Sequence, residues 1–151
     1  MDKIFSNKKV VIVAAKWNSL VTDEMVEGAL KALQTSGLKQ DHIVVHRCPG
    51  TFELPLAVKW ALDHEKADAV VAIGAVIRGD TPHFDYVCDA VTRGIGDLML
   101  QYSKPVAFGV LTTDTVKQAR ERSGLSKGNK GAEAAIAALD MMKLHVSMSG
   151  D

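Results

Sequence analysis

The segment RGDTPHFDY carries the side chain best suited to proton transfer, that of His83. The segment follows an apolar run, so Gly79 allows a tight exit from a predicted strand, and Asp80 or Thr81 can cap the helix that follows. Free backbone N–H groups at such a turn form an anion site. An imidazole with an unperturbed pKa of about 6.5 moves protons near neutrality. The competing interpretation is a surface or capping histidine.

A second segment, ERSGLSKGNKGAE, offers cations to an anionic group. Arg122, Lys127 and Lys130 lie among three glycines before a predicted helix, where side-chain cations and backbone amides can meet a phosphate. A P-loop is excluded because it needs four residues between its glycines and must leave a strand, whereas three separate them here. The turn AAKWNS has no glycine, so a dinucleotide fingerprint is missing too.

Four of the eight aromatic residues lie at or near the carboxyl ends of predicted strands: Trp17, Phe52, Phe84 and Phe108. Ligands of open parallel sheets bind beyond those ends, so the rings can provide stacking walls for a flat heteroaromatic ligand. The alternative is that they close the end of a hydrophobic core. Glu53, beside Phe52, is either a solvated carboxylate or a partner for ring N–H groups of such a ligand.

Histidine and cysteine spacing supports neither a metal centre nor a disulfide framework. His42 and His46 are predicted to share one face of a strand, but no third ligand is spaced to join them. Cys48 and Cys88 can form at most one bridge and lack C-x-x-C spacing, so we expect them to be reduced and the protein to be cytoplasmic. We expect no metal and no bound cofactor.

Length and charge favour a single domain that associates with copies of itself. The 151 residues suffice for one compact core, predicted to span 1–151. The 18 Lys and Arg balance 18 Asp and Glu, so nucleic acid is not an expected partner. Zero net charge also does little to keep copies apart. The amino-terminal apolar run, 10–15, is too short for a secretion signal or a membrane span.

Strands and helices that alternate along the chain must position these segments. Apolar runs rich in Val and Ile, without alternation, predict strands buried on both faces. These runs are 10–15, 43–45, 69–77 and 106–111.

Helical patterns lie between the predicted strands, and several of them have a start or stop signal. They run from Thr22, as a cap, to Gly37, from Pro55 to about His64, from about Phe84 to Tyr102, from about Thr115 to Arg122, and from Gly131 onward. Alternating strands and helices joined by right-handed crossovers predict a three-layer α/β/α sandwich around a central four-stranded parallel sheet.

Taken together and in order, the loop segments resemble those of the lumazine synthase family. KWN follows the first strand and PGTFELP the second, GAVIRGDTPHFDYVC spans the third strand and its loop, PVAFGVLTTD covers the fourth, and ERSG and GNKG stand near the end. The resemblance runs nearly from end to end and implies a flavodoxin-like fold.

The resemblance implies a transferase of riboflavin biosynthesis. Such an enzyme condenses 5-amino-6-ribitylaminouracil with 3,4-dihydroxy-2-butanone 4-phosphate, giving 6,7-dimethyl-8-ribityllumazine, phosphate and water. A flat pyrimidine needs stacking walls, a sugar phosphate needs an anion site, and the condensation needs a proton shuttle but no metal or redox cofactor.

The resemblance also implies which residues meet the pyrimidine substrate. Trp17 takes the stacking position, and the ribityl chain and uracil edge are held by its neighbours and by backbone groups of the third strand. These residues are Asn18, Thr51, Phe52, Glu53, Ala75, Val76 and Ile77.

On the phosphate side, the resemblance implies a turn at Asp80 and Thr81, with His83 as the proton-transfer residue. Phe108 and Arg122 match residues that an adjoining subunit supplies, and Lys130 matches a nearby lysine.

Two departures from the family pattern stand out. Asp80 puts a carboxylate where a phosphate should bind, which fits only if the turn uses its amides and the carboxylate points away. Ser126 stands where some relatives have a second lysine, with Lys127 one place later.

The resemblance implies pentamers, and the short connection 124–131 is similar to that of relatives whose pentamers close into a sixty-subunit icosahedral shell. An association with riboflavin synthase is part of this expectation. The alternatives are a flavodoxin-like binding or regulatory domain and a shell-forming or ligand-carrying protein with little catalysis. A receiver domain would need paired acids at the end of the first strand, which here reads AAKW.

Overall fold

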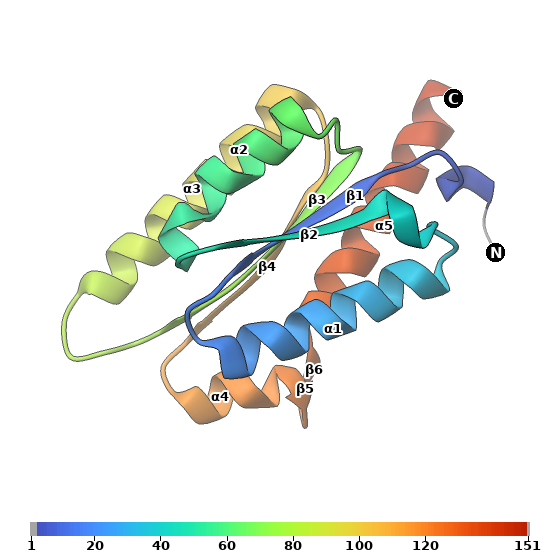
Figure 1. Ribbon diagram of the computed structural model, residues 1–151. Coiled ribbons are helices and arrows are strands. Elements are labelled where there is room, and N and C mark those ends of the chain that lie inside the picture. The colour runs from blue at the N-terminus through green and yellow to red at the C-terminus, as the bar shows by residue number, and fades with distance from the viewer. Residues whose placement is uncertain (1–2, 151) are drawn as a thin grey trace.

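The computed structural model describes residues 3–150, in which a parallel four-stranded sheet lies between two layers of helices (Figure 1). The strands are β1 (Val10–Ala15), β2 (Ile43–Cys48), β3 (Ala69–Ile77) and β4 (Val106–Thr113), in the spatial order β2-β1-β3-β4. All neighbouring pairs are parallel. The predicted three-layer α/β/α sandwich is confirmed.

The helices cover both faces of this sheet. They are α1 (Ser19–Thr35), α2 (Leu54–His64), α3 (His83–Tyr102), α4 (Val116–Glu121) and α5 (Lys130–Ser149). Short 3-10 turns lie at η1 (Lys3–Phe5), η2 (Gln40–His42) and η3 (Thr51–Glu53). Figure 1 shows α2 and α3 on one face and α1, α4 and α5 on the other. No helix among the described residues is both long and apolar enough for a membrane span.

Alternate residues of the central strands pack into two separate hydrophobic cores, one on each face of the sheet. In β1, Val10, Ile12 and Ala14 pack with α1 and α5, whereas Val11 and Val13 pack with α2 and α3. Successive side chains of a strand point to opposite faces, so a central strand must be apolar throughout. This explains why β1 and β3 have no polar alternation.

The edge strand β2 differs from the prediction. It continues to Cys48, and its residues Val45, His46 and Arg47 are exposed. The prediction of burial on both faces is therefore wrong for this strand, because only one neighbour pairs with it. His42 lies in η2, before the strand, so the prediction that it shares a strand face with His46 is also wrong.

Two predicted helix caps are wrong. Helix α1 begins at Ser19, after Asn18 in the left-handed conformation (φ 63°, ψ 44°), whereas Thr22 is 0% exposed inside the core. Helix α3 follows Pro82 without a side-chain cap, although Thr81 Oγ1 accepts a 3.4 Å hydrogen bond from the His83 N–H. Helix α4, predicted from about Thr115, begins at Val116, and the Thr115 hydroxyl caps it by accepting from the Gln118 N–H.

An antiparallel hairpin of β5 (Ser123–Leu125) and β6 (Gly128–Asn129) precedes α5 and was not predicted. Asn129 organises it: its side chain caps α5 at the Ala132 N–H and donates to the carbonyls of Glu24 and Ser123. A Cβ at Gly131 would lie 2.0 Å from the Met25 oxygen of α1. The glycine-rich segment therefore holds α5 against α1.

Candidate active site

The predicted pyrimidine-side residues and His83 line one pocket of about 420 Å³, which we call the aromatic pocket. It is formed where β1 and β3 end, between η3 and the first turns of α3. Its lining residues are Trp17, Asn18, Thr51, Phe52, Glu53, Ala75, Val76, Ile77, His83, Tyr86 and Val87. Segments that are far apart in the chain, and that were predicted to contribute to one site, therefore line one pocket.

The aromatic walls of this pocket are unusually exposed. Trp17 is 66% exposed and Phe52 is 58% exposed. The backbone N–H of Trp17 donates to the Pro49 carbonyl at 3.0 Å. A Cβ at Gly50 would lie only 2.4 Å from the Trp17 indole. The close approach of Gly50 thus fixes one face of the indole, and the ring offers a preformed apolar surface to a flat ligand.

Hydrogen bonds to Ala75 form the floor of the pocket. Its carbonyl accepts from Asn18 Nδ2 (3.0 Å) and Thr51 Oγ1 (3.3 Å), and its N–H donates to Thr51 Oγ1 (3.2 Å). A Cβ at Gly74 would lie 2.6 Å from that hydroxyl. The backbone of Ala75 is therefore engaged within the chain and holds Asn18 and Thr51 in place.

The backbone groups of Ile77, two residues after Ala75 in β3, lie beyond the part of β3 that pairs with β1. The pairing of β1 with β3 ends at Ala14↔Ile73, while β3 continues beside β4 as far as Ile77↔Thr113. The N–H and C=O groups of one residue point to the same side of a strand, and the side alternates along the strand. Because Ala75 faces the β1 side, Ile77 also faces it and presents its N–H and C=O to the pocket.

Glu53 lines the pocket, whereas the buried Cys48, whose thiol donates to the Gly50 carbonyl at 3.5 Å, is not among the lining residues. Glu53 Oε1 accepts from the Gly50 N–H at 3.0 Å, and within residues 3–150 no donor occupies its second oxygen. Burial, and then the negative charge of Glu53, raise the pKa of the Cys48 thiol. Cys48 therefore stays protonated near neutrality and is not a candidate nucleophile.

His83 is exposed at the start of α3, and one turn later Tyr86, 72% exposed, lines the same pocket. Sequence reasoning missed Tyr86. Its spacing from His83 was the available signal, because residues three apart on a helix share a face.

The turn before α3 keeps unpaired donors. In the described chain, the N–H groups of Gly79, Asp80 and Thr81 have no hydrogen-bond partner. Asp80 and Thr81 are exposed and lie outside the pocket lining. Such a turn suits an anion bound through backbone amides.

The remaining predicted residues, Phe108, Arg122 and Lys130, line a different pocket of about 490 Å³, which we call the cationic pocket. Strand β4 runs on to Thr113, so Phe108 lies within the strand and not at its end. The further lining residues, which include the unpredicted Glu133, are Val110, Leu111, Thr112, Thr113, Lys127 and Glu133.

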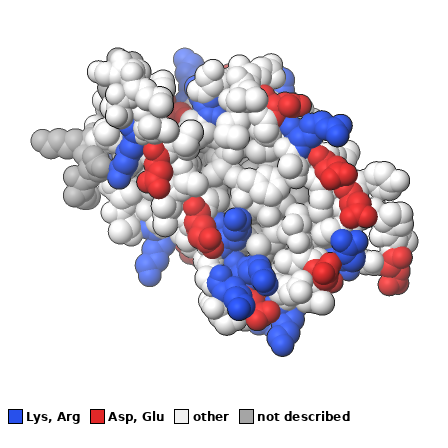
Figure 2. All heavy atoms as spheres, turned by 180° about the vertical axis from the view of Figure 1, so that it is seen from behind, with Lys and Arg blue, Asp and Glu red and all other residues white. Residues whose placement is uncertain are grey.

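Side chains, and not amides, make the cationic pocket suitable for an anion. The N–H groups of Lys127, Lys130 and Ala132 donate to Glu121 O, Arg122 O and Asn129 Oδ1. On the face seen in Figure 2, Lys and Arg are mixed with Asp and Glu, and a group of Lys and Arg gathers at the lower edge, at the height of α4 and the hairpin in Figure 1.

Among residues 3–150, the aromatic and cationic pockets have no lining residue in common. Phe84, the fourth aromatic candidate, belongs to neither, because it is buried beneath the Arg78 guanidinium at 4.3 Å. Across residues 3–150, no three His, Cys, Asp or Glu side chains gather in a way that could hold a metal ion.

Known proteins share this sequence over most of its length. A sequence model of the 6,7-dimethyl-8-ribityllumazine synthase family matches residues 7–146. The 6,7-dimethyl-8-ribityllumazine synthase of Parabacteroides distasonis is 48% identical over 137 residues, which cover 91% of this chain and 86% of the relative. The enzyme of the same name from Campylobacter jejuni subsp. doylei is 49% identical over 139 residues, covering 92% and 90%. The chain therefore belongs to the 6,7-dimethyl-8-ribityllumazine synthase family.

Proposed function

We propose that the protein condenses 5-amino-6-ribitylaminouracil with 3,4-dihydroxy-2-butanone 4-phosphate to 6,7-dimethyl-8-ribityllumazine, releasing phosphate and water. The observation that carries this proposal is the aromatic pocket, where three exposed aromatic rings, a carboxylate and a histidine from separate segments converge. Held there, the amine and the ketone react as neighbours, which removes much of the entropic barrier.

The pyrimidine occupies the aromatic pocket in this proposal. Trp17 stacks on the ring with Phe52 beside it, the free oxygen of Glu53 accepts from the ligand, and Ile77 bonds the uracil edge through its backbone. Val76 contributes apolar surface, while Ala75 holds Asn18 and Thr51 toward the ribityl chain.

The phosphate of the second substrate is bound by the amides of the 79–81 turn, from which the Asp80 carboxylate points away. His83 transfers protons during imine formation, phosphate elimination and ring closure. Arg122 supplies the charged, fork-shaped contact to the phosphate, and Lys130 adds a second cation.

Each active site is shared between two subunits in this proposal. The aromatic pocket of one chain faces the cationic pocket of the next, which brings Phe108 and Arg122 to the ligand. The separation of the two pockets within one chain supports this arrangement. A cyclic ring repeats one heterologous interface, so every subunit gives one half of a site to each neighbour.

We further propose that the rings are pentamers, that the pentamers close into a sixty-subunit shell, and that riboflavin synthase associates with it in the cytoplasm. The short hairpin over 123–129 supports the shell, because the connection 124–131 is similar to that of relatives whose pentamers close into shells. Light scattering should detect shell-sized particles, and only pentamer-sized particles in phosphate buffer would contradict the shell. Copurification tests the association.

The direct test of the activity is incubation with both substrates while the absorbance of the lumazine product is followed. We expect product only when both substrates are present. Tight binding of the pyrimidine without product would instead indicate a ligand carrier or shell protein.

A further inference from the structure

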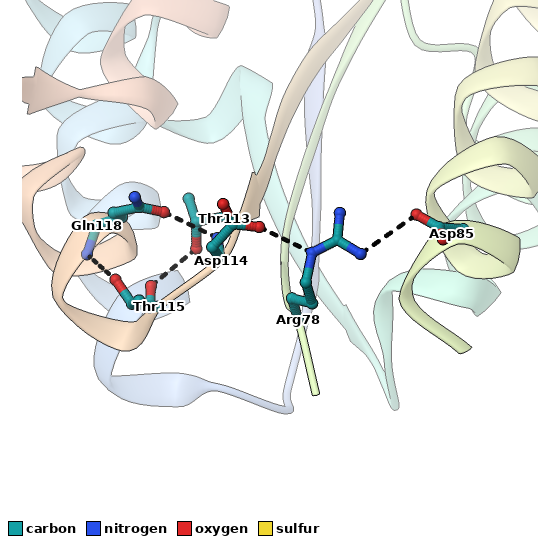
Figure 3. A network of polar contacts seen from close by, with 6 residues as sticks. All are labelled: Arg78, Asp85, Thr113, Asp114, Thr115 and Gln118. Atoms are coloured by element: carbon teal, nitrogen blue, oxygen red, sulfur yellow. Dashed lines mark hydrogen bonds and ion pairs between the residues drawn. The ribbon is translucent and has the colours of Figure 1, made fainter. Parts of the chain in front are cut away.

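The Arg78 guanidinium lies between two carboxylates, those of Asp85 and Asp114 (Figure 3). It also lies above an aromatic ring. Its Nε donates to Asp114 Oδ1 at 2.8 Å, and its Nη1 lies 3.7 Å from Asp85 Oδ1. The guanidinium carbon lies 4.3 Å from the centroid of the Phe84 ring. A planar fork that bonds on two sides and stacks on a ring is a role that arginine fills and lysine does not.

These contacts join the two ends of the phosphate-binding turn to the end of β4. Asp85 and Phe84 belong to the first turn of α3, directly after His83, while Asp114 follows β4. The backbone N–H of Arg78 also donates to the Thr113 carbonyl at 2.9 Å. The free amides at 79–81 therefore lie in a loop that is held at its start and its finish.

The contacts continue toward the cationic pocket. The Asp114 N–H donates to Gln118 Oε1 at 2.8 Å, and the Gln118 carbonyl accepts from Arg122 Nη1 at 3.1 Å. Figure 3 shows this line from Asp85 through Arg78 and Asp114 to Gln118. Arg122, one turn further along the chain from Gln118, is thus connected to the helix that carries His83.

We propose that Arg78 is a positioning residue, which fixes the 79–81 turn and His83 relative to α4 and Arg122 and does not bind phosphate itself. This inference rests on the proposed function for its kinetic readouts. The two pockets of one chain serve different active sites in the ring. Arg78 therefore fixes the position of the part of one active site that this chain supplies relative to the part that it supplies to the neighbouring active site.

The charge of Arg78 is already compensated within the chain. The hydrogen bond to Asp114, and the nearby charge of Asp85, raise its pKa, so it remains a cation at every relevant pH. Exposed ion pairs contribute little to the stability of a fold. Loss of this contact should therefore change catalysis much more than the melting temperature.

Asp114→Asn provides the decisive test, because it loosens Arg78 without removing it. We expect Asp114→Asn and Arg78→Gln each to lower kcat/KM for the butanone phosphate by ~10-fold, since a small misplacement of reacting groups is costly. The double variant should be far less than additive. Arg78→Lys should recover little of the activity, because it keeps the charge but loses the fork.

Lys59→Gln is the matched control at the other end of α3. Lys59 Nζ contacts both Asp63 and Tyr102 at 2.9 Å, and so ties α2 to the last residue of α3. We expect unchanged kinetics in this variant. If an Arg78 variant fails to assemble into rings, Asp85→Asn is tested in its place, because it removes only the longer, 3.7 Å contact of Arg78.

Hydrogen–deuterium exchange separates this inference from the proposed function. In Asp114→Asn, the hydrogen-bonded amides of Arg78, His83 and Asp85, which flank the turn, should exchange faster than in the wild type or in Lys59→Gln, whether or not the wild type makes lumazine. If Asp114→Asn leaves exchange and KM unchanged, or lowers KM, while Arg78→Gln raises KM, then Arg78 is a phosphate ligand and the inference is wrong. Unchanged kinetics and exchange in both variants would also overturn it.

Discussion

The aromatic and cationic pockets are built by different means. The aromatic pocket takes its shape from close backbone approaches, at Gly50 against Trp17 and at Gly74 against Thr51. In the described part of the chain, its lining contains one carboxylate and no Lys or Arg. The cationic pocket brings three cations and one carboxylate together beside a short hairpin. A flat ring is recognised by rigid apolar walls, whereas a phosphate is recognised by charge and donors, so one chain needs both kinds of construction.

The largest effect is expected from the loss of His83, which lines the aromatic pocket. His83→Ala should lower kcat by about a hundredfold or less, at the bottom of the usual range for a positioned acid or base, because an amine and a ketone condense unaided once held together. Affinity for the lumazine product should be nearly unchanged, as measured by titration. Wild-type turnover across pH 6 to 8 would remove His83 from the mechanism.

In the other half, Arg122→Ala should raise KM for the butanone phosphate by ~10- to 100-fold and leave pyrimidine binding unchanged. A hydrogen bond between two charged groups is worth about 1.5–3 kcal/mol, which corresponds to that factor. Arg120→Ala is the control, because it removes the same charge from α4 outside the cationic pocket. Equal losses in both variants would indicate a general effect of charge.

Gly50→Ala tests whether shape alone defines the aromatic pocket. Its Cβ would lie 2.4 Å from the Trp17 ring, so the indole must move, and we expect pyrimidine affinity to fall by ~10-fold because misplacement of a positioning group is costly. Steady-state kinetics should show an unchanged KM for the phosphate substrate. Gly96→Ala is the control, since its Cβ would meet nothing within 4 Å. Undiminished pyrimidine binding in Gly50→Ala would show that Trp17 needs no support.

A smaller, spectroscopic signal separates the two tryptophans. Trp17 lines the aromatic pocket, whereas Trp60, 55% exposed on α2, lines neither pocket. Lumazine or riboflavin should therefore quench Trp17 fluorescence and leave Trp60 nearly unaffected. Trp17→Phe should bind without quenching, and Trp60→Phe should retain it. Persistent quenching in Trp17→Phe would mean that the stacking residue has been misassigned.

The sequence predicts the sheet and the aromatic pocket well because both depend on long apolar patterns and on the rule that loops gather at strand ends. The bounds of β3 match the predicted 69–77, and loops after three strands meet in one pocket. Exposure of β2 could not be predicted, because an apolar run does not say whether a strand is central or at an edge. The missed residue Tyr86 lay in a helix that sequence reasoning treated only as a scaffold.

Local side-chain chemistry misled the remaining predictions. Thr22 has the chemistry of a cap but is buried, while Asn18 adopts the left-handed conformation and bonds across the sheet to Ala75. Likewise, the glycines of GNKG suggested amides for a phosphate, but Asn129 and Gly131 pack the hairpin and α5 against α1. Both outcomes depend on contacts between segments distant in the sequence.

Complementation between variants tests most directly the central claim that each site joins the aromatic pocket of one subunit to the cationic pocket of the next. His83→Ala and Arg122→Ala subunits are unfolded together, reassembled in equal amounts and shown to form hybrid rings. Random mixing gives about a quarter of interfaces with both native residues. Activity at limiting butanone phosphate should rise above the mean of the two pure variants, toward ~25% of the wild type. Activity equal to that mean in hybrid rings would place His83 and Arg122 in the site of a single subunit and contradict the shared site.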